Sequence, residues 1–134
     1  MGLDCSHDAF HGAYSSFNRL RQFVCKSIGG SYPPHETEGL EPEAWYFGEG
    51  YNKEKNPGLY EFFCHSDCDG EISPEMCSLV ANELESILPL LKKLEEITEA
   101  YGHILFNGGY VGTVEKFIAG CRKAAELNEP LLFS

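Results

Sequence analysis

Apolar side chains recur at intervals of three and four residues in three stretches of the chain, which is the spacing of helices with one buried face. The first stretch follows Ser15 and Ser16, either of which can cap a helix, and it stops at Gly29 and Gly30. Its apolar stripe contains Phe17, Leu20, Val24 and Ile28. The pattern predicts a first helix that begins at one of the two serines and ends before the glycines.

The second stretch opens with the letters SPEMC, in which Ser73 can cap a helix, Pro74 suits its first position and Glu75 complements its dipole. One long apolar stripe follows, formed by Met76, Leu79, Val80, Leu84, Ile87, Leu88, Leu91 and Leu94. Pro89 interrupts the stripe, because proline lacks an amide hydrogen and crowds the carbonyl four residues before it. We predict a long helix that is kinked or broken near Pro89 and that ends at Gly102.

The third stretch runs from near Gly112 to Leu127, and Pro130 lies just beyond it. Its apolar face is formed by Val114, Phe117, Ile118, Cys121 and Ala125. The glycines of NGGYVGT directly before it could leave helix amides free for an anion. The lysine and the spacing of a phosphate loop are missing, so a tight turn with Thr113 or Asn107 as the cap is the favoured interpretation.

A different composition separates the first two helices. Residues 31–58 are rich in Gly, Pro and Glu, which predicts an irregular segment. The letters GLYEFFCHS are the best candidate for a strand because of their aromatic residues, although so short a run is equally compatible with a helix. The patterns together predict the mainly α class with a small β component (α+β), with three to four helices in one domain over residues 1–134.

Composition places the chain among folded proteins, because 43% of its residues are hydrophobic and 13% are aromatic. No apolar run approaches the about 20 residues that a membrane helix needs, and the first residues lack the pattern of a secretion signal. The six cysteines form no CxxC pair, so we expect reduced thiols. These features predict a cytoplasmic protein that does not bind membranes; they leave its oligomeric state open.

Acidic residues outnumber basic ones, and the formal net charge is -11. Such a chain is not expected to bind nucleic acid, because that requires a basic patch, whereas a cationic protein partner would fit. Part of the charge lies in the irregular segment, at Glu36, Glu38, Glu41, Glu43 and, close by, Glu49. One alternative function is therefore an acidic interaction protein that mimics the charge of nucleic acid, although the same charge also keeps a small domain soluble.

The letters HSDCDGEISPEMC approximate the loop that binds calcium in an EF-hand. With Gly70 at the sixth position of that loop, Asp67 and Asp69 fall at the third and fifth. However, the first position is His65 and the twelfth is Met76, where calcium takes carboxylate oxygens. We therefore do not expect calcium binding, and we interpret the letters as a turn that leads into a capped helix.

Histidine and carboxylates at this turn suit a transition metal better, because imidazole and carboxylate groups are ligands of zinc and manganese. His65, Asp67 and Asp69 could supply one half of such a site. The amino-terminal letters LDCSHD offer Asp4 and His7 as the other half. The sequence thus predicts that these five residues converge on one polar site for a metal, zinc or manganese, or for another ligand.

The letters HDAFH place His7 and His11 at the spacing of the zinc-protease motif HExxH. Here an aspartate replaces the glutamate base, and Gly12 follows where the helix should continue, so a protease is disfavoured. For either histidine alone, an ordinary polar role near the start of the first helix is the favoured interpretation. The leading prediction for the chain is a small intracellular binding protein, and a metal-assisted hydrolase with His7 as proton shuttle is the alternative.

Two long blocks, GLDCSHDAFHGAYSSFNRLR and GLYEFFCHSDCDGEISPEMC, and the tail GGYVGTVEKFIAGCRKAAELNEPL resemble a family of small uncharacterised bacterial and phage-associated proteins. The resemblance covers most of the chain, and the Glu-rich middle is its least typical part. It implies a prokaryotic cytoplasmic protein. It implies no activity, cofactor or site residue, so the predicted site depends on residue chemistry alone.

Overall fold

The computed structural model describes residues 2–30, 47–65, 69–105 and 109–134 of the chain. Within them lie five α-helices: α1 (Tyr14–Ser27), α3 (Pro57–Cys64), α4 (Pro74–Ser86), α5 (Leu88–Leu105) and α6 (Gly109–Glu126). The other described elements are a short 3-10 helix, η1 (Ser6–Asp8), and four short strands: β1 (Gly2–Cys5), β2 (Phe10–Ala13), β3 (Glu71–Ile72) and β4 (Leu131–Leu132). The predicted class, mainly α with a small β component, is confirmed, with one helix more than the upper predicted number.

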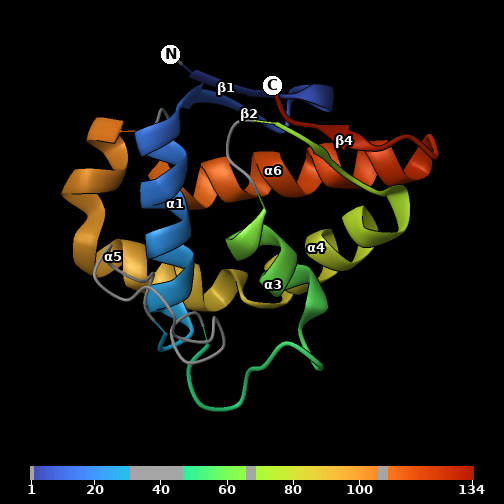
Figure 1. Cartoon of the computed structure of the whole chain (residues 1–134). Coiled ribbons are helices and arrows are strands. Elements are labelled where there is room, and N and C mark those ends of the chain that lie inside the picture. The colour runs from blue at the N-terminus through green and yellow to red at the C-terminus, as the bar shows by residue number, and fades with distance from the viewer. Residues whose placement is uncertain (1, 31–46, 66–68, 106–108) are drawn as a thin grey trace, which may run out of the picture.

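Helix α6 crosses the molecule, and the other elements are arranged around it (Figure 1). The hairpin of β1 and β2 lies along one side of α6, and α4 and α5 pack along the other. Three buried rings mark the centre of the core: Phe62 of α3 lies 5.7 Å from Phe17 of α1 and 5.3 Å from Phe117 of α6, both edge to face. The buried apolar side chains form one connected core.

The long apolar stripe is divided between two helices, as Pro89 predicted. The break falls at Ile87, whose φ of -104° and ψ of 4° end α4, and α5 begins at Leu88. Pro89 therefore lies in the first turn of α5, where its missing amide hydrogen has no helical partner to lose. Leu84 and Leu91 are buried on the two sides of the break, so both helices face the core with part of the stripe, whereas Leu79 of the same stripe is exposed.

The segment GLYEFFC is a helix and not the strand that its aromatic residues favoured. Proline at the first position of α3 suits a helix start, and Leu59, Phe62 and Phe63 share one buried face at helical spacing. Because α3 begins at Pro57, the irregular segment predicted over residues 31–58 ends two residues earlier. Its first part, residues 31–46, lies outside the described residues.

Two helix boundaries also differ from the prediction. Helix α1 begins at Tyr14, before either predicted serine cap, because β2 leads directly into it. Helix α5 continues through Gly102 to Leu105, since a single glycine weakens a helix by only about 1 kcal/mol and does not stop it. By contrast, Gly29 ends the last turn of α1 as predicted, with a φ of 83° that suits glycine.

The C-terminal residues 131–134 lie between β1 and β3. Strand β4 pairs with β3 in antiparallel register, and Phe133 forms an isolated bridge with Cys5. Asp4 and Ser134 exchange two backbone hydrogen bonds of 2.9 Å each. The two ends of the described chain therefore lie side by side at one edge of the molecule (Figure 1).

In the described part of the chain, none of the helices combines the length and the apolar character that crossing a membrane requires.

Candidate functional site

The amino-terminal hairpin exposes a cluster that we call the His11 cluster, formed by Asp4, Asp8 and His11. The register of the hairpin pairs Asp4 with His11 across the two strands. Leu3 and Cys5 on either side of Asp4 are buried, so the alternation of the strand turns Asp4 outward, beside His11. The local sequence therefore determines that these two side chains meet on the solvent face.

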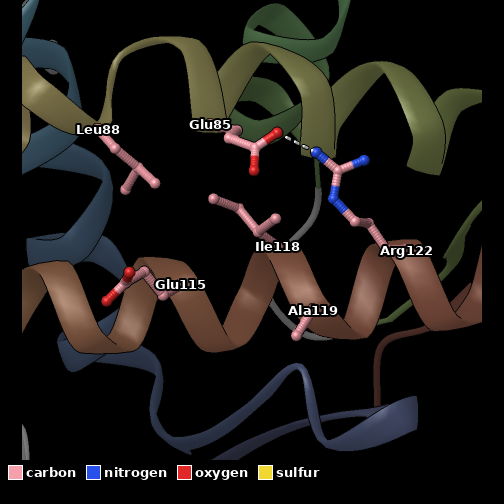
Figure 2. Close-up of a pocket in the computed structure, with 6 residues that line it drawn as sticks. All are labelled: Glu85, Leu88, Glu115, Ile118, Ala119 and Arg122. Atoms are coloured by element: carbon pink, nitrogen blue, oxygen red, sulfur yellow. Dashed lines mark hydrogen bonds and ion pairs between the residues drawn. The ribbon is translucent and has the colours of Figure 1, made fainter.

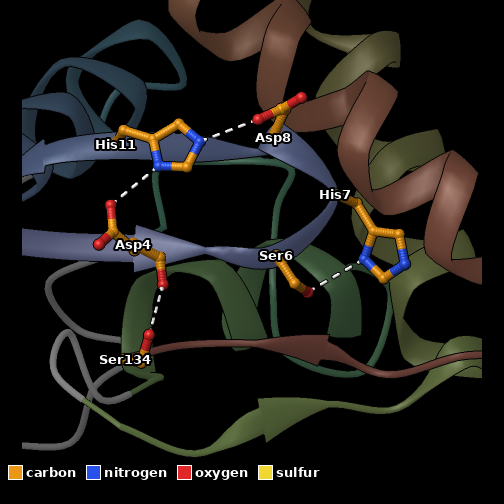
Figure 3. Close-up of polar contacts among 6 residues, drawn as sticks. All are labelled: Asp4, Ser6, His7, Asp8, His11 and Ser134. Carbon is orange, nitrogen blue, oxygen red and sulfur yellow. Dashed lines mark hydrogen bonds and ion pairs between the residues drawn. The ribbon is translucent and has the colours of Figure 1, made fainter.

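Both ring nitrogens of His11 face a carboxylate (Figure 3). Nδ1 lies 2.9 Å from Asp4 Oδ1, and Nε2 lies 3.1 Å from Asp8 Oδ1. The hydrogen bond with Asp4, followed by that with Asp8, raises the pKa of His11 above its usual 6.5. The side chains stay open to solvent, with 46% of His11, 72% of Asp4 and 88% of Asp8 exposed.

The turn that carries Asp8 over His11 has unusual backbone geometry. His7 and Asp8 both lie in the left-handed region, with φ of 59° and 57°. Aspartate and histidine enter this region more readily than most residues, but each such residue still costs on the order of 1 kcal/mol compared with a relaxed conformation. Two adjacent non-glycine residues in this conformation therefore place backbone strain directly beside the His11 cluster.

His7 belongs to a different set of contacts. Its Nε2 lies 2.8 Å from Glu129 Oε1, and its Nδ1 lies 3.0 Å from the Ser6 hydroxyl. The same hydroxyl accepts a hydrogen bond of 2.8 Å from the backbone of Leu132. His7 thus connects the hairpin turn to the segment that follows α6, and it points away from Asp4 and His11 (Figure 3).

His65 also has a structural role. Its Nε2 lies 3.0 Å from the carbonyl oxygen of Glu71, and its ring contacts the ring of Phe133, with 4.1 Å between the ring centroids and a tilt of 40°. Its own carbonyl accepts a hydrogen bond from the guanidinium of Arg21, which is buried on α1. Asp69 is exposed nearby in the sequence.

Three of the five residues predicted for one metal site have different partners. Asp4 bonds His11, His7 bonds Glu129, and His65 bonds the Glu71 carbonyl; Asp67 lies outside the described residues. The C-terminal residues 131–134 run between the hairpin half and the β3 half of the predicted set. Over the residues that the structure describes, no three His, Cys, Asp or Glu side chains are grouped so that they could hold a metal ion.

The turn-and-cap interpretation of HSDCDGEISPEMC agrees with the described part of this loop. Gly70 has a φ of 93°, which favours glycine, and its carbonyl accepts a 2.9 Å hydrogen bond from Phe133. The Ser73 hydroxyl accepts a hydrogen bond of 3.2 Å from the amide of Met76 and caps α4 as predicted.

The backbone amides at the start of α6 donate hydrogen bonds to a carboxylate side chain of the same protein. The carboxylate of Glu95 on α5 accepts hydrogen bonds from the backbone of Tyr110 and Val111, the second at 3.1 Å. Of the two predicted caps, Thr113 donates to a carbonyl of the first turn at 2.9 Å, and Asn107 lies outside the described residues. Glu95 therefore supplies the negative charge that this helix start favours.

Four of the five described cysteines, Cys5, Cys25, Cys77 and Cys121, are buried free thiols. Burial raises the pKa of Cys5 to about 12. The thiols of Cys77 on α4 and Cys121 on α6 form a hydrogen bond, which lowers the pKa of Cys77 and raises that of Cys121. Because both are fully buried, they serve the core as small apolar side chains.

Comparison of the chain with family models, with curated proteins and with solved structures gives no match. The resemblance to bacterial and phage-associated proteins therefore remains a prediction.

Proposed function

We propose that this chain is a binding protein and that two residues of its His11 cluster, His11 and Asp8, bind a transition-metal ion, with zinc or manganese as the metals that these two ligands suit. One observation supports the proposal above all. Both ring nitrogens of His11 lie within hydrogen-bond distance of carboxylates, yet all three side chains remain open to solvent.

Asp4 orients the histidine for this purpose. Metal-binding histidines usually donate the N–H of the nitrogen that is not a ligand to a carboxylate or carbonyl, which fixes the tautomer and makes the ligand more basic. When Nδ1–H of His11 is donated to Asp4, Nε2 is the nitrogen left for a metal. Asp4 would then act through His11 and would not touch the ion.

Asp8 supplies the second ligand atom with little movement. His11 Nε2 and Asp8 Oδ1 lie 3.1 Å apart. Nitrogen and oxygen ligands at the bond lengths of tetrahedral zinc are separated by roughly 3.4 Å, so a few tenths of an ångström would admit the ion. Water molecules would complete the coordination at this exposed position.

A metal ion at Nε2 must displace the proton that His11 shares with Asp8. The pKa of His11 is raised by both carboxylates, so the ring holds this proton to a higher pH than an ordinary surface histidine. Metal affinity should therefore fall as the pH decreases through that raised pKa. An adventitious surface histidine would lose metal at a lower pH, near its usual pKa of about 6.5.

The test is zinc titration of metal-free protein, followed by calorimetry and by the melting temperature. We expect Asp4→Asn to weaken zinc binding by about 10 to 100 fold, as is typical for such orienting partners, and His11→Ala to abolish it. Asp69→Asn removes the same charge from another exposed carboxylate and should leave affinity unchanged. His35→Ala and His103→Ala control for zinc on other histidines. Zinc binding of His11→Ala equal to that of the wild type would refute the proposal.

A further inference from the structure

The seam between α4 and α6 carries an open groove on a part of the surface that the His11 cluster does not use. Two cavities meet there, of about 240 Å³ and about 400 Å³, and Arg122 lines both. The smaller is lined also by residues near the junction of α4 and α5, and the larger by Ser78 and Glu126. Because Ser78 lies opposite Glu126 and Leu88 lies opposite Glu115, the two helices run in opposite directions along the groove.

Arg122 bridges the groove at its middle. Its Nη1 donates a 3.1 Å hydrogen bond to Asn82 Oδ1, and its Nη2 donates to the carboxylate of Glu85 (Figure 2). These contacts neutralise the only Lys or Arg that lines either cavity in the described chain. The bridge therefore leaves the remaining rim acidic.

The floor of the groove is apolar and its rim is negative. Ile118 points from α6 toward α4, and Leu88 points back toward it (Figure 2). Ala119 and Ala125 extend the apolar strip along α6. Three glutamates also line the groove: Glu85 is paired with Arg122, and Glu115 and Glu126 leave the rim negative.

Basic residues flank the groove on one side only. Helix α4 contains no Lys or Arg in its whole length. On α6, Lys116 and Lys123 each follow a groove residue by one position and so point about 100° further around the helix. A partner seated over the seam would thus meet Glu115 and Glu126, which are exposed.

We propose that this groove binds a basic amphipathic helix of a partner protein. From Glu115 to Glu126 the groove follows α6 for about 16 Å, or three turns, which matches a helix that anchors itself by apolar residues at every third or fourth position. Lysine or arginine beside those anchors would pair with the glutamates of the rim. The proposal concerns a separate surface and does not depend on metal binding by the His11 cluster.

A second copy of the chain is a poorer occupant on grounds of charge. An isologous contact would place the glutamates of one rim against those of the other, and each chain carries a formal charge of -11. Like charges brought together at an interface oppose association. The charge of the groove therefore favours a cationic partner.

The probe is a synthetic peptide of about 14 residues with leucine repeated every three and four positions and lysine elsewhere, labelled for fluorescence anisotropy. One control peptide has glutamate in place of every lysine. Another has the lysines and leucines in scrambled order. The protein variants are Glu115→Gln with Glu126→Gln, Ala119→Arg, and a matched pair, Glu54→Gln with Glu96→Gln, which removes two exposed charges elsewhere.

We expect the lysine peptide to bind the wild type. It should bind the double variant Glu115→Gln with Glu126→Gln, the groove pair, about tenfold more weakly, because both lost charges face the ligand. The matched pair should differ from the wild type by about twofold at most, since distant exposed charges are screened by salt. Ala119→Arg should abolish binding of the lysine peptide, because the arginine side chain would fill the floor of the groove and repel the lysines. Equal affinity of the groove pair and the matched pair, or equal binding of the glutamate or scrambled peptide, would overturn the proposal. So would a wild-type dimer in light scattering that Ala119→Arg dissociates, because the groove would then bind a second copy.

Discussion

Carboxylates accept hydrogen bonds both at the start of α6 and at the turn of the amino-terminal hairpin. The two regions differ in the donor, which is the backbone in the first and a side chain in the second. At α6, Glu95 accepts hydrogen bonds from backbone amides that the helix leaves without an intrahelical partner. At the hairpin, Asp4 and Asp8 bond a side chain, His11, that stays half exposed. The first arrangement supplies an acceptor to amides at the start of a helix. In the second, water could replace the carboxylates as hydrogen-bond partners of the exposed imidazole.

This difference separates a structural carboxylate from a candidate functional one. Removing Glu95 leaves two amides of a helix start without an acceptor, so the fold should lose stability. Removing Asp4 or Asp8 leaves His11 hydrated, so the fold should lose little. The hairpin turn nevertheless keeps His7 and Asp8 in a strained backbone conformation. We therefore expect substitutions in the helical core to change stability strongly and substitutions at the His11 cluster to change it little.

The largest effect should come from the core beneath both regions. Leu84 is fully buried, and Leu84→Ala should lower the free energy of unfolding by about 2 to 5 kcal/mol through lost burial and the cavity left behind. Leu79 lies on the same helix with 39% exposure, so Leu79→Ala should cost under about 1 kcal/mol. Urea unfolding of both variants measures the contrast. Equal losses would mean that α4 does not face the core as described.

A smaller loss is expected at the start of α6. Glu95→Ala should lower the free energy of unfolding by about 1 to 2 kcal/mol, the range found when a helix cap is removed. Glu96→Ala is the control, because this neighbour has the same chemistry and is exposed. If thermal or urea unfolding shows the two variants to be equally stable, Glu95 is not a structural cap and the comparison fails.

Gly109 offers a way to sharpen this result. It has a φ of 81°, and a Cβ atom there would lie 2.6 Å from Glu95 Oε2. Gly109→Ala should therefore displace the same carboxylate and strain the backbone, and combining it with Glu95→Ala should cost less than the sum of the two. A double-mutant cycle in urea tests this coupling, which strict additivity would contradict.

The smallest effect is expected at the His11 cluster, and it should depend on pH. The pKa of His11 is raised in the folded state, so its contribution is fully present below about pH 6.5 and is lost as the pH rises through the raised value. Solvent screening limits this contribution to about 0.5 kcal/mol. The unfolding free energies of His11→Gln and the wild type should thus differ at about pH 6 and converge near pH 9. A difference that grows with pH would have the wrong sign for this account.

The sequence predicts the helices well where the signal is local. Ser73 and Pro74 open α4, Gly29 ends α1, and Pro89 divides the long stripe, because each acts through the backbone of its own segment. It fails where the deciding contact is distant in sequence. Glu95 caps a helix that begins 14 residues later, and no local pattern identifies it.

The candidate site was predictable in part for the same reason. Asp4 was selected from its residue type and position, but its partner depends on the hairpin register that pairs it with His11. The signal in the sequence for that hairpin was the alternation of the apolar residues Leu3 and Cys5 with polar ones before a short turn, and both of these residues are buried in the structure. The bond between His7 and Glu129 joins residues from opposite ends of the chain, and sequence alone does not predict such a contact.

The central claim is that the hairpin presents His11 Nε2 and Asp8 to a metal ion, and imidazole nitrogen NMR tests it most directly. On addition of an equimolar amount of zinc, the account predicts a change at His11 Nε2, with Nδ1 still protonated toward Asp4 and with His7 and His65 unchanged. The Asp8→Asn variant should show a weaker response at the same atom. An unchanged His11 spectrum, or a response confined to His7 or His65, would contradict the claim.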